Sequence, residues 1–79
     1  MNEEQKKAFT QFVKIAKRKN FHSIVCLSAA AIMDQSGDNW QDTMNAIIQL
    51  AEKSKNGDEF LECLLSDFKQ YVQEVSEQD

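Results

Sequence analysis

The sequence predicts an all-α fold, a compact bundle of four mostly antiparallel helices joined by short loops. Three observations lead to this prediction. The 79 residues contain no proline and only two glycines, so few residues interrupt helical segments. Apolar side chains recur at the spacing of helix faces along most of the chain. The predicted connections are short, which favours antiparallel neighbours within one helical domain, residues 1–79.

The first helix is expected at residues 3–19. Asn2 and Gln5 have the spacing of a capping box, and acidic residues in the first turn and basic residues in the last match the helix dipole. Asn20 can end the helix in the left-handed backbone region. One face is apolar and carries Phe9, Phe12, Val13 and Ala16.

The second helix, residues 23–36, contains the most apolar stretch of the chain. Nine of the ten residues from Ile24 to Met33 are apolar, and only Ser28 interrupts them. A helix that is apolar all round must be surrounded by other chain, so we expect this one at the enclosed centre of the core. Ser23 is its expected N-cap, and Gly37 its C-terminal stop.

The last two helices are expected at residues 39–55 and 58–76. Asp38 or Asn39 is expected to cap the third helix, and Asp58 the fourth. The third helix has an apolar stripe of Trp40, Met44, Ile47, Ile48 and Ala51. The fourth has one of Leu61, Leu64, Leu65, Phe68, Val72 and Val75, with Phe60 and Tyr71 beside it.

Charge is unevenly distributed along the chain. Residues 1–20 hold six basic and two acidic side chains, a net of +4, whereas residues 21–79 hold three basic and eleven acidic, a net of −8. The whole chain therefore carries −4, and its acidic body disfavours nucleic acid as the main ligand because phosphates would be repelled.

The beginning of the chain and its cysteines bear on the compartment. Met1-Asn2-Glu3-Glu4 is acidic where a secretory leader would be basic, and the two cysteines form no CxxC pair. We expect a cytoplasmic protein with reduced thiols. No apolar stretch is long enough to cross a bilayer, so no membrane association is expected.

The sequence offers little equipment for catalysis or metal binding. The segment 34–39 begins like a calcium loop, but Asn39 and Asn45 stand where such a loop needs glycine and a bidentate glutamate. His22, Cys26 and Cys63 would make a zinc site only if the second and fourth helices met. His22 and Cys26 are four residues apart and could pair as a base and a nucleophile, but no third residue orients the base and a thiol in apolar surroundings is inert. Core thiols are the favoured interpretation. We expect no cofactor, no metal and no enzyme activity.

The favoured function is that of a small acidic protein-interaction module, such as an adaptor, inhibitor or regulator of another protein. Self-association as a homodimer is expected, because the apolar surface exceeds what one small bundle can cover. The alternative is a small DNA-associated transcriptional regulator whose basic first helix contacts phosphates. The candidate partner-binding residues are Trp40, Lys14, Lys17, Arg18, Glu59 and Glu62.

Each group of candidate residues also has a plainer interpretation. Trp40 is either a lid over the core or an exposed anchor, since tryptophan is enriched at binding hot spots. The basic residues of the first helix are either a contact surface for an acidic partner or a solvated face. The acidic residues of the fourth helix either meet a basic partner or keep the chain in solution.

Overall fold

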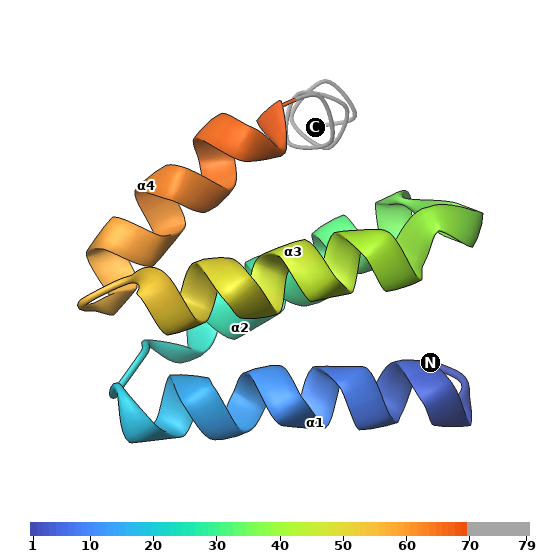
Figure 1. Cartoon of the computed structure of the whole chain (residues 1–79), viewed down its shortest axis with the longest axis horizontal. Helices are drawn as coiled ribbons and strands as arrows, with labels where there is room; N and C mark the ends of the chain where they lie inside the picture. Colours follow the sequence, from blue (N-terminus) through green and yellow to red (C-terminus); the bar gives the residue numbers. More distant parts are fainter. Residues whose placement is uncertain (70–79) are drawn as a thin grey trace.

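A computed structural model describes residues 1–69, and the helical bundle expected from the sequence is confirmed (Figure 1). Its elements are α1 (Glu3–Arg18), α2 (Ser23–Gln35), the short 3-10 helix η1 (Gly37–Asn39), α3 (Trp40–Lys53) and α4 (Gly57–Asp67). The first three predicted helices agree with these bounds to within two residues. The predicted fourth helix continues beyond Asp67, and its part from residue 70 onward lies outside the described residues.

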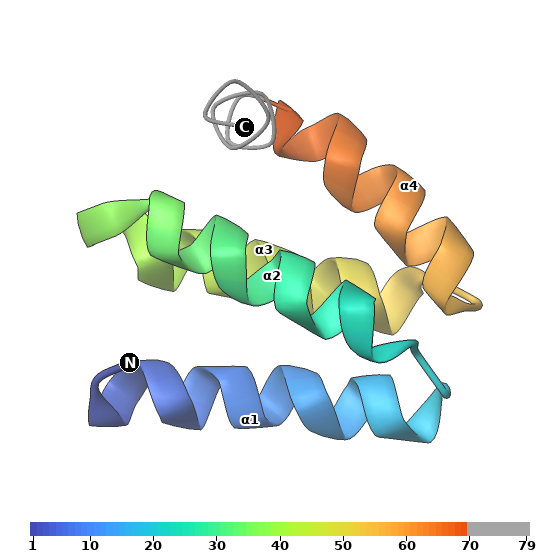
Figure 2. The same cartoon turned by 180° about the vertical axis from the view of Figure 1, so that it is seen from behind.

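Successive helices run in opposite directions, so α1 and α3 are parallel to each other (Figure 1). α2 and α3 lie side by side between α1 on one flank and α4 on the other, as the front and back views agree (Figure 2). The most extensive packing is between α1 and α3, and α2 contacts all three other α-helices. The two middle helices therefore each face the core on one side and solvent on the other.

The enclosed position expected for the segment 23–36 is wrong. α2 buries only one face, which consists of Val25, Ala29, Ile32 and Met33. On the opposite face Ile24 is 59% exposed and Leu27 is 68% exposed. The physical reason is geometric: the other helices of residues 1–69 pack against one side of α2, so an all-round apolar helix keeps a face that none of them covers.

The core is centred on aromatic rings from three segments. Phe12 and Phe60 are fully buried with ring centroids 5.5 Å apart, and Phe21 stacks on Phe60 at 5.1 Å. Phe60 was expected beside the apolar face of α4 and instead lies in its buried centre, whereas Leu65, expected on that face, is 41% exposed. Aliphatic residues complete the core, chiefly Met33, Met44, Ile47 and Leu64.

Both ends of α1 follow the sequence prediction. The Gln5 backbone N–H donates to Asn2 Oδ1 at 2.7 Å and the Asn2 N–H donates to Gln5 Oε1 at 3.0 Å, which completes the capping box. Asn20 adopts φ 59°, and the N–H of Phe21 reaches the carbonyl of Ala16 at 2.8 Å. This left-handed turn is the Schellman ending, for which asparagine is the usual substitute for glycine.

Two of the predicted helix caps are wrong, and a third is in place without its hydrogen bond. His22, not Ser23, caps α2, because its Nδ1 accepts from the Ile24 N–H at 3.3 Å. Asn56, not Asp58, caps α4, since its Oδ1 accepts from the Glu59 N–H at 2.9 Å. At α3, the predicted residue Asn39 does occupy the N-cap position, but its side chain makes no capping hydrogen bond. The other predicted residue, Asp38, lies within η1, which begins at Gly37 with φ 59° and continues directly into α3.

Candidate functional site

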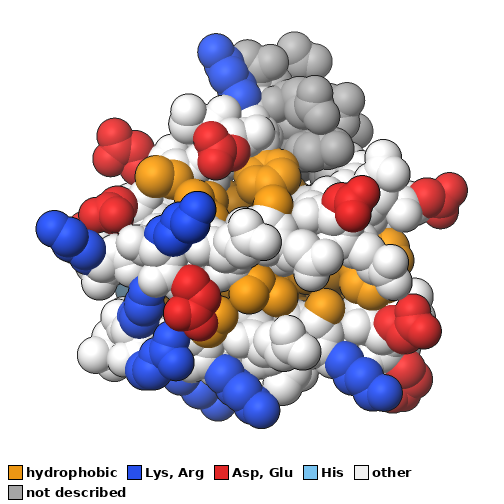
Figure 3. Space-filling model, in the orientation of Figure 1, with side chains coloured by type: hydrophobic (Ala, Val, Ile, Leu, Met, Phe, Trp, Pro, Cys, Tyr) orange, Lys and Arg blue, Asp and Glu red, His pale blue; other side chains and the backbone are white. Residues whose placement is uncertain are grey.

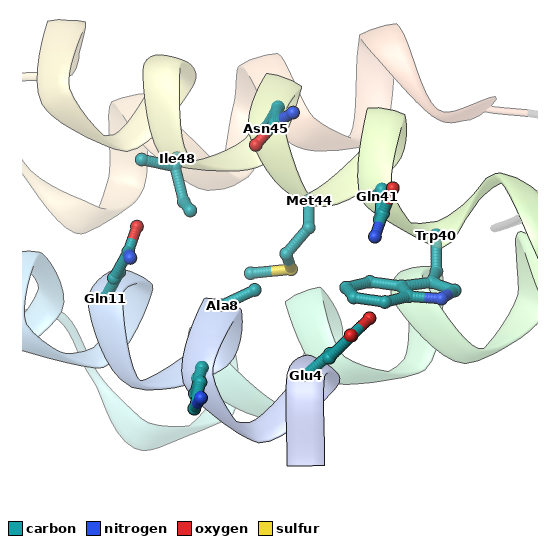
Figure 4. Close-up of a pocket in the computed structure, with 9 residues that line it drawn as sticks. Glu4, Ala8, Gln11, Trp40, Gln41, Met44, Asn45 and Ile48 are labelled. Atoms are coloured by element: carbon teal, nitrogen blue, oxygen red, sulfur yellow. The ribbon is translucent and has the colours of Figure 1, made fainter. Parts of the chain in front are cut away.

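A groove of about 370 Å³ runs along the seam between α1 and α3 (Figure 4). Its apolar lining residues are buried or half-buried: Ala8, Trp40, Met44 and Ile48. Its polar lining residues are exposed: Glu4, Lys7, Gln11, Gln41 and Asn45. The groove therefore has an apolar floor and a polar rim.

The spacing of residues along the two helices explains this arrangement. On α1 the lining positions follow i, i+4 and i+7 from Glu4, which places them on one face. On α3 the apolar lining positions follow i, i+4 and i+8 from Trp40. The polar lining residues Gln41 and Asn45 each come directly after one of them in the sequence. The small Ala8 side chain faces the longer Met44 across the seam and leaves the space that larger pairs would fill (Figure 4).

Three side-chain amides dominate the chemistry of the rim. Gln11 comes from α1, and Gln41 and Asn45 come from the first two turns of α3 (Figure 4). An amide group both donates and accepts hydrogen bonds and carries no charge. The two charged rim residues, Glu4 and Lys7, have opposite signs and lie near the start of α1. The groove as a whole is therefore polar at its edge without a net charge.

Trp40 combines both interpretations offered by the sequence. Its side chain is half-buried and packs against the core cluster, as a lid would. It also forms one end of the groove, where the indole lies across the seam toward α1 (Figure 4). A ring held in place by the core and open on one side is the kind of rigid surface that binding sites use.

The basic candidates on α1 lie outside this groove. Lys14 and Lys17 are exposed, and basic side chains gather along the lower edge of the molecule in Figure 3. Arg18 Nη2 forms an ion pair with Glu52, at 3.2 Å from Oε1, so part of its charge is matched within the fold. Trp40 and the three basic residues were predicted together as candidate partner-binding residues, and the structure places them on different surfaces.

The acidic candidate residues, Glu59 and Glu62, lie on a third surface of the molecule. Glu59 and Glu62 are exposed on α4, which lies on the other flank of the middle helices from α1 (Figure 1). The Glu59 backbone N–H is bonded by the Asn56 cap, so this residue also belongs to the first turn of α4. The six candidate residues therefore form three separate surfaces.

Of the residues considered for metal binding or nucleophilic chemistry, His22 and Cys26 lie at the start of α2 and Cys63 is half-buried on α4. His22 uses Nδ1 to cap α2, and burial raises the pKa of the half-buried Cys26 thiol. A raised pKa lowers the fraction of reactive thiolate. Within residues 1–69, no group of three or more histidine, cysteine or acidic side chains is placed to hold a metal ion.

Two features were missed by sequence reasoning. The amide rim involves Gln11 on one helix and two α3 residues, and only the contact between these helices brings them together. The outer face of α2, with Ile24 and Leu27, was assigned to the core. The sequence held a signal for the rim, because Gln41 and Asn45 flank the apolar stripe of α3 at i and i+4.

No helix in the described part of the chain is long and apolar enough to cross a membrane.

In comparisons with known proteins, no family model matches this chain, and no curated protein or solved structure shows significant similarity to it.

Proposed function

We propose that this chain is a small protein-interaction module without catalytic activity, and that it holds a short uncharged segment of another protein in the groove between α1 and α3. The observation that carries this proposal is the composition of the groove. An apolar floor of buried Met44 and half-buried Ala8, Trp40 and Ile48 lies beneath three exposed amides that come from both helices. Groups of this kind bind and orient a ligand and do not themselves transfer protons at neutral pH.

The dimensions suit a peptide. The lining residues of α3 extend from Trp40 to Ile48, a rise of about 12 Å at 1.5 Å per residue. An extended chain advances about 3.3 Å per residue, so the groove accommodates three or four residues. The backbone of such a segment presents N–H and C=O groups that pair with the amides of Gln11, Gln41 and Asn45.

The charges favour a neutral segment with one large apolar side chain. Glu4 and Lys7 offset each other at one end of the groove, so neither sign of ligand is attracted. The floor beside Trp40 and Met44 excludes water from an apolar side chain seated there. Specificity would then come from shape and from the amide hydrogen bonds.

The test is a titration of isotope-labelled protein with neutral hexapeptides that each carry one large apolar residue, followed by NMR. We expect at least one peptide to shift the side-chain amides of Gln11, Gln41 and Asn45 together with the Trp40 indole N–H. Ala8→Leu, which fills the groove, should weaken that binding about tenfold or more, a cost typical of lost burial. The matched control Ala46→Leu adds the same group at an exposed position of α3 and should leave binding unchanged.

Two results would overturn the proposal. One is the absence of groove shifts with every peptide at millimolar concentration. The other is binding to duplex DNA at low salt that falls steeply as salt rises and is lost in Lys14→Glu with Lys17→Glu, which would establish the DNA-associated alternative.

A further inference from the structure

The outer face of α2 is apolar and carries no charge until its last turn. Ile24, Leu27 and Ala31 are exposed at the i, i+3 and i+7 spacing of one helix face, and the segment 23–33 contains no ionisable side chain except the half-buried Cys26. This surface is separate from the α1–α3 groove, whose lining includes no α2 residue. The view from behind shows α2 at the front of the molecule with no described helix in front of it (Figure 2).

The two ends of α2 supply a second, independent observation. α2 alone among the four described α-helices has neither an acidic residue in its first turn nor a basic residue in its last. The exposed Asp34 instead lies in the last turn, at the negative end of the helix dipole, where a carboxylate is unfavourable. A favourable position for that carboxylate is the N-terminus of another helix.

We propose that a second copy of this chain covers this face, with the two α2 helices packed antiparallel about a two-fold axis near Leu27 and Ser28. In this register the large Ile24 lies opposite the small Ala31 of the other copy, so the surfaces interlock. Asp34 of each copy comes beside the N-terminal turn of the other α2, near His22 and Ser23. One antiparallel contact therefore improves the electrostatics at both ends of both helices.

Self-complementarity identifies the second copy as the occupant. The α2 face carries no charged side chain over residues 23–33, so the net charge of −4 on the chain opposes another copy less there than at the acidic surface of α4, where Glu59 and Glu62 are exposed. The one charge at its edge, Asp34, is matched by the same helix in the other copy. A two-fold axis also closes the assembly at two chains, because the patch is used by both. The patch is small, so we expect a weak dimer with a Kd on the order of 10–100 µM.

Sedimentation equilibrium of the full chain from about 1 µM to about 1 mM tests the proposal. The wild type should pass from monomer to dimer across this range. Leu27→Glu should weaken dimerisation about tenfold or more while the monomer stays folded, because Leu27 is 68% exposed. Gln49→Glu is the control, since it adds the same charge at an exposed position of α3 and should leave the dimer intact.

Asp34→Asn tests the antiparallel orientation. In the proposed arrangement it removes a favourable contact with the N-terminus of the other helix and should weaken the dimer a few-fold. In a parallel pair the two Asp34 carboxylates would face each other, and the same variant would strengthen the dimer. A strengthened dimer would therefore overturn the orientation proposed here.

Other results identify other occupants of the face. A wild type that stays monomeric to about 1 mM overturns the proposal. If Leu27→Glu also lowers the thermal stability of that monomer, the protein's own chain covers the α2 face. Peptide-induced NMR shifts at Gln11, Gln41 and Asn45 should persist in Leu27→Glu, so failure of the dimer and failure of the groove function can be told apart.

Discussion

The two middle helices, α2 and α3, both lie between α1 and α4, but their solvent-facing sides differ in polarity. Each buries one face in the core and turns the other to solvent. The outer face of α3 is mostly polar, with Gln41, Asp42 and Asn45 exposed, whereas that of α2 exposes Ile24 and Leu27. The difference shows that burial in this bundle is set by which neighbours a helix has and not by how apolar it is.

The ends of the two helices differ in the same way. α3 has Asp42 in its first turn and Lys53 in its last. Lys19, the C-cap residue of the parallel helix α1, also binds the C-terminus of α3. The Lys19 ammonium donates hydrogen bonds to the carbonyls of Ala51 at 2.8 Å, Glu52 at 2.6 Å and Ser54 at 2.7 Å. Because α1 and α3 run parallel, their negative ends lie at the same end of the bundle, and this cation offsets both.

The largest expected difference between the two helices is in how much one isoleucine side chain contributes to the free energy of unfolding. Ile47 of α3 is 0% exposed and Ile24 of α2 is 59% exposed. Ile47→Ala should lower the free energy of unfolding by about 2–5 kcal/mol, because it leaves a cavity in the core. Ile24→Ala should change it by no more than about 0.5 kcal/mol when the chain is dilute and monomeric.

Urea unfolding followed by circular dichroism at low micromolar concentration measures both isoleucine variants. Equal losses would mean that the α2 face is covered in the monomer. A loss for Ile24→Ala that grows with protein concentration would instead support the proposed dimer.

An intermediate effect on stability is expected from removing the Lys19 ammonium group, which binds the C-terminal carbonyls of α3. Lys19→Met keeps the aliphatic stem and removes three charge-assisted hydrogen bonds, so it should cost about 1–2 kcal/mol. Lys17→Met is the matched control, because Lys17 is exposed and close in sequence, and it should cost less than about 0.5 kcal/mol. Thermal and urea unfolding at two salt concentrations compare the two, and similar losses would argue against a role for Lys19 at the end of α3.

The smallest effect concerns Cys26, on the half-buried side of α2. Burial raises the pKa of its thiol. A thiol whose folded pKa exceeds its unfolded value stabilises the fold fully below the unfolded pKa of about 8.5, and the contribution is lost as pH rises through the folded pKa. In a Cys63→Ser background, the stability advantage of Cys26 over Cys26→Ser should therefore decline above about pH 8.5.

Alkylation of the same Cys63→Ser protein checks the cause of that decline. The rate of reaction with iodoacetamide should rise with pH at a higher midpoint in the folded protein than in denaturant, because the thiolate is the reacting form. Identical pH profiles in the two states would show that α2 leaves Cys26 as solvated as it is in the unfolded chain.

Local features of this protein were determined by the sequence alone. The all-α class, the approximate bounds of the first three helices, the Asn2–Gln5 capping box and the left-handed Asn20 each depend on residues within a few positions of one another. Hydrogen bonds and backbone sterics at that range are the same in any fold that contains the segment. The apolar stripe of α3 likewise became its buried face, because period and face are properties of one helix.

Tertiary structure decided which faces were covered and which side chains met. Ile24 and Leu27 are as apolar as Ile32, but no helix among the described residues covers their side of α2. The groove depends on the approach of Ala8 to Met44, and the end of α3 depends on Lys19, a partner 32 to 35 residues away. Contacts at such separation depend on how helices pack against one another, and this packing is a property of the whole chain that no single segment encodes.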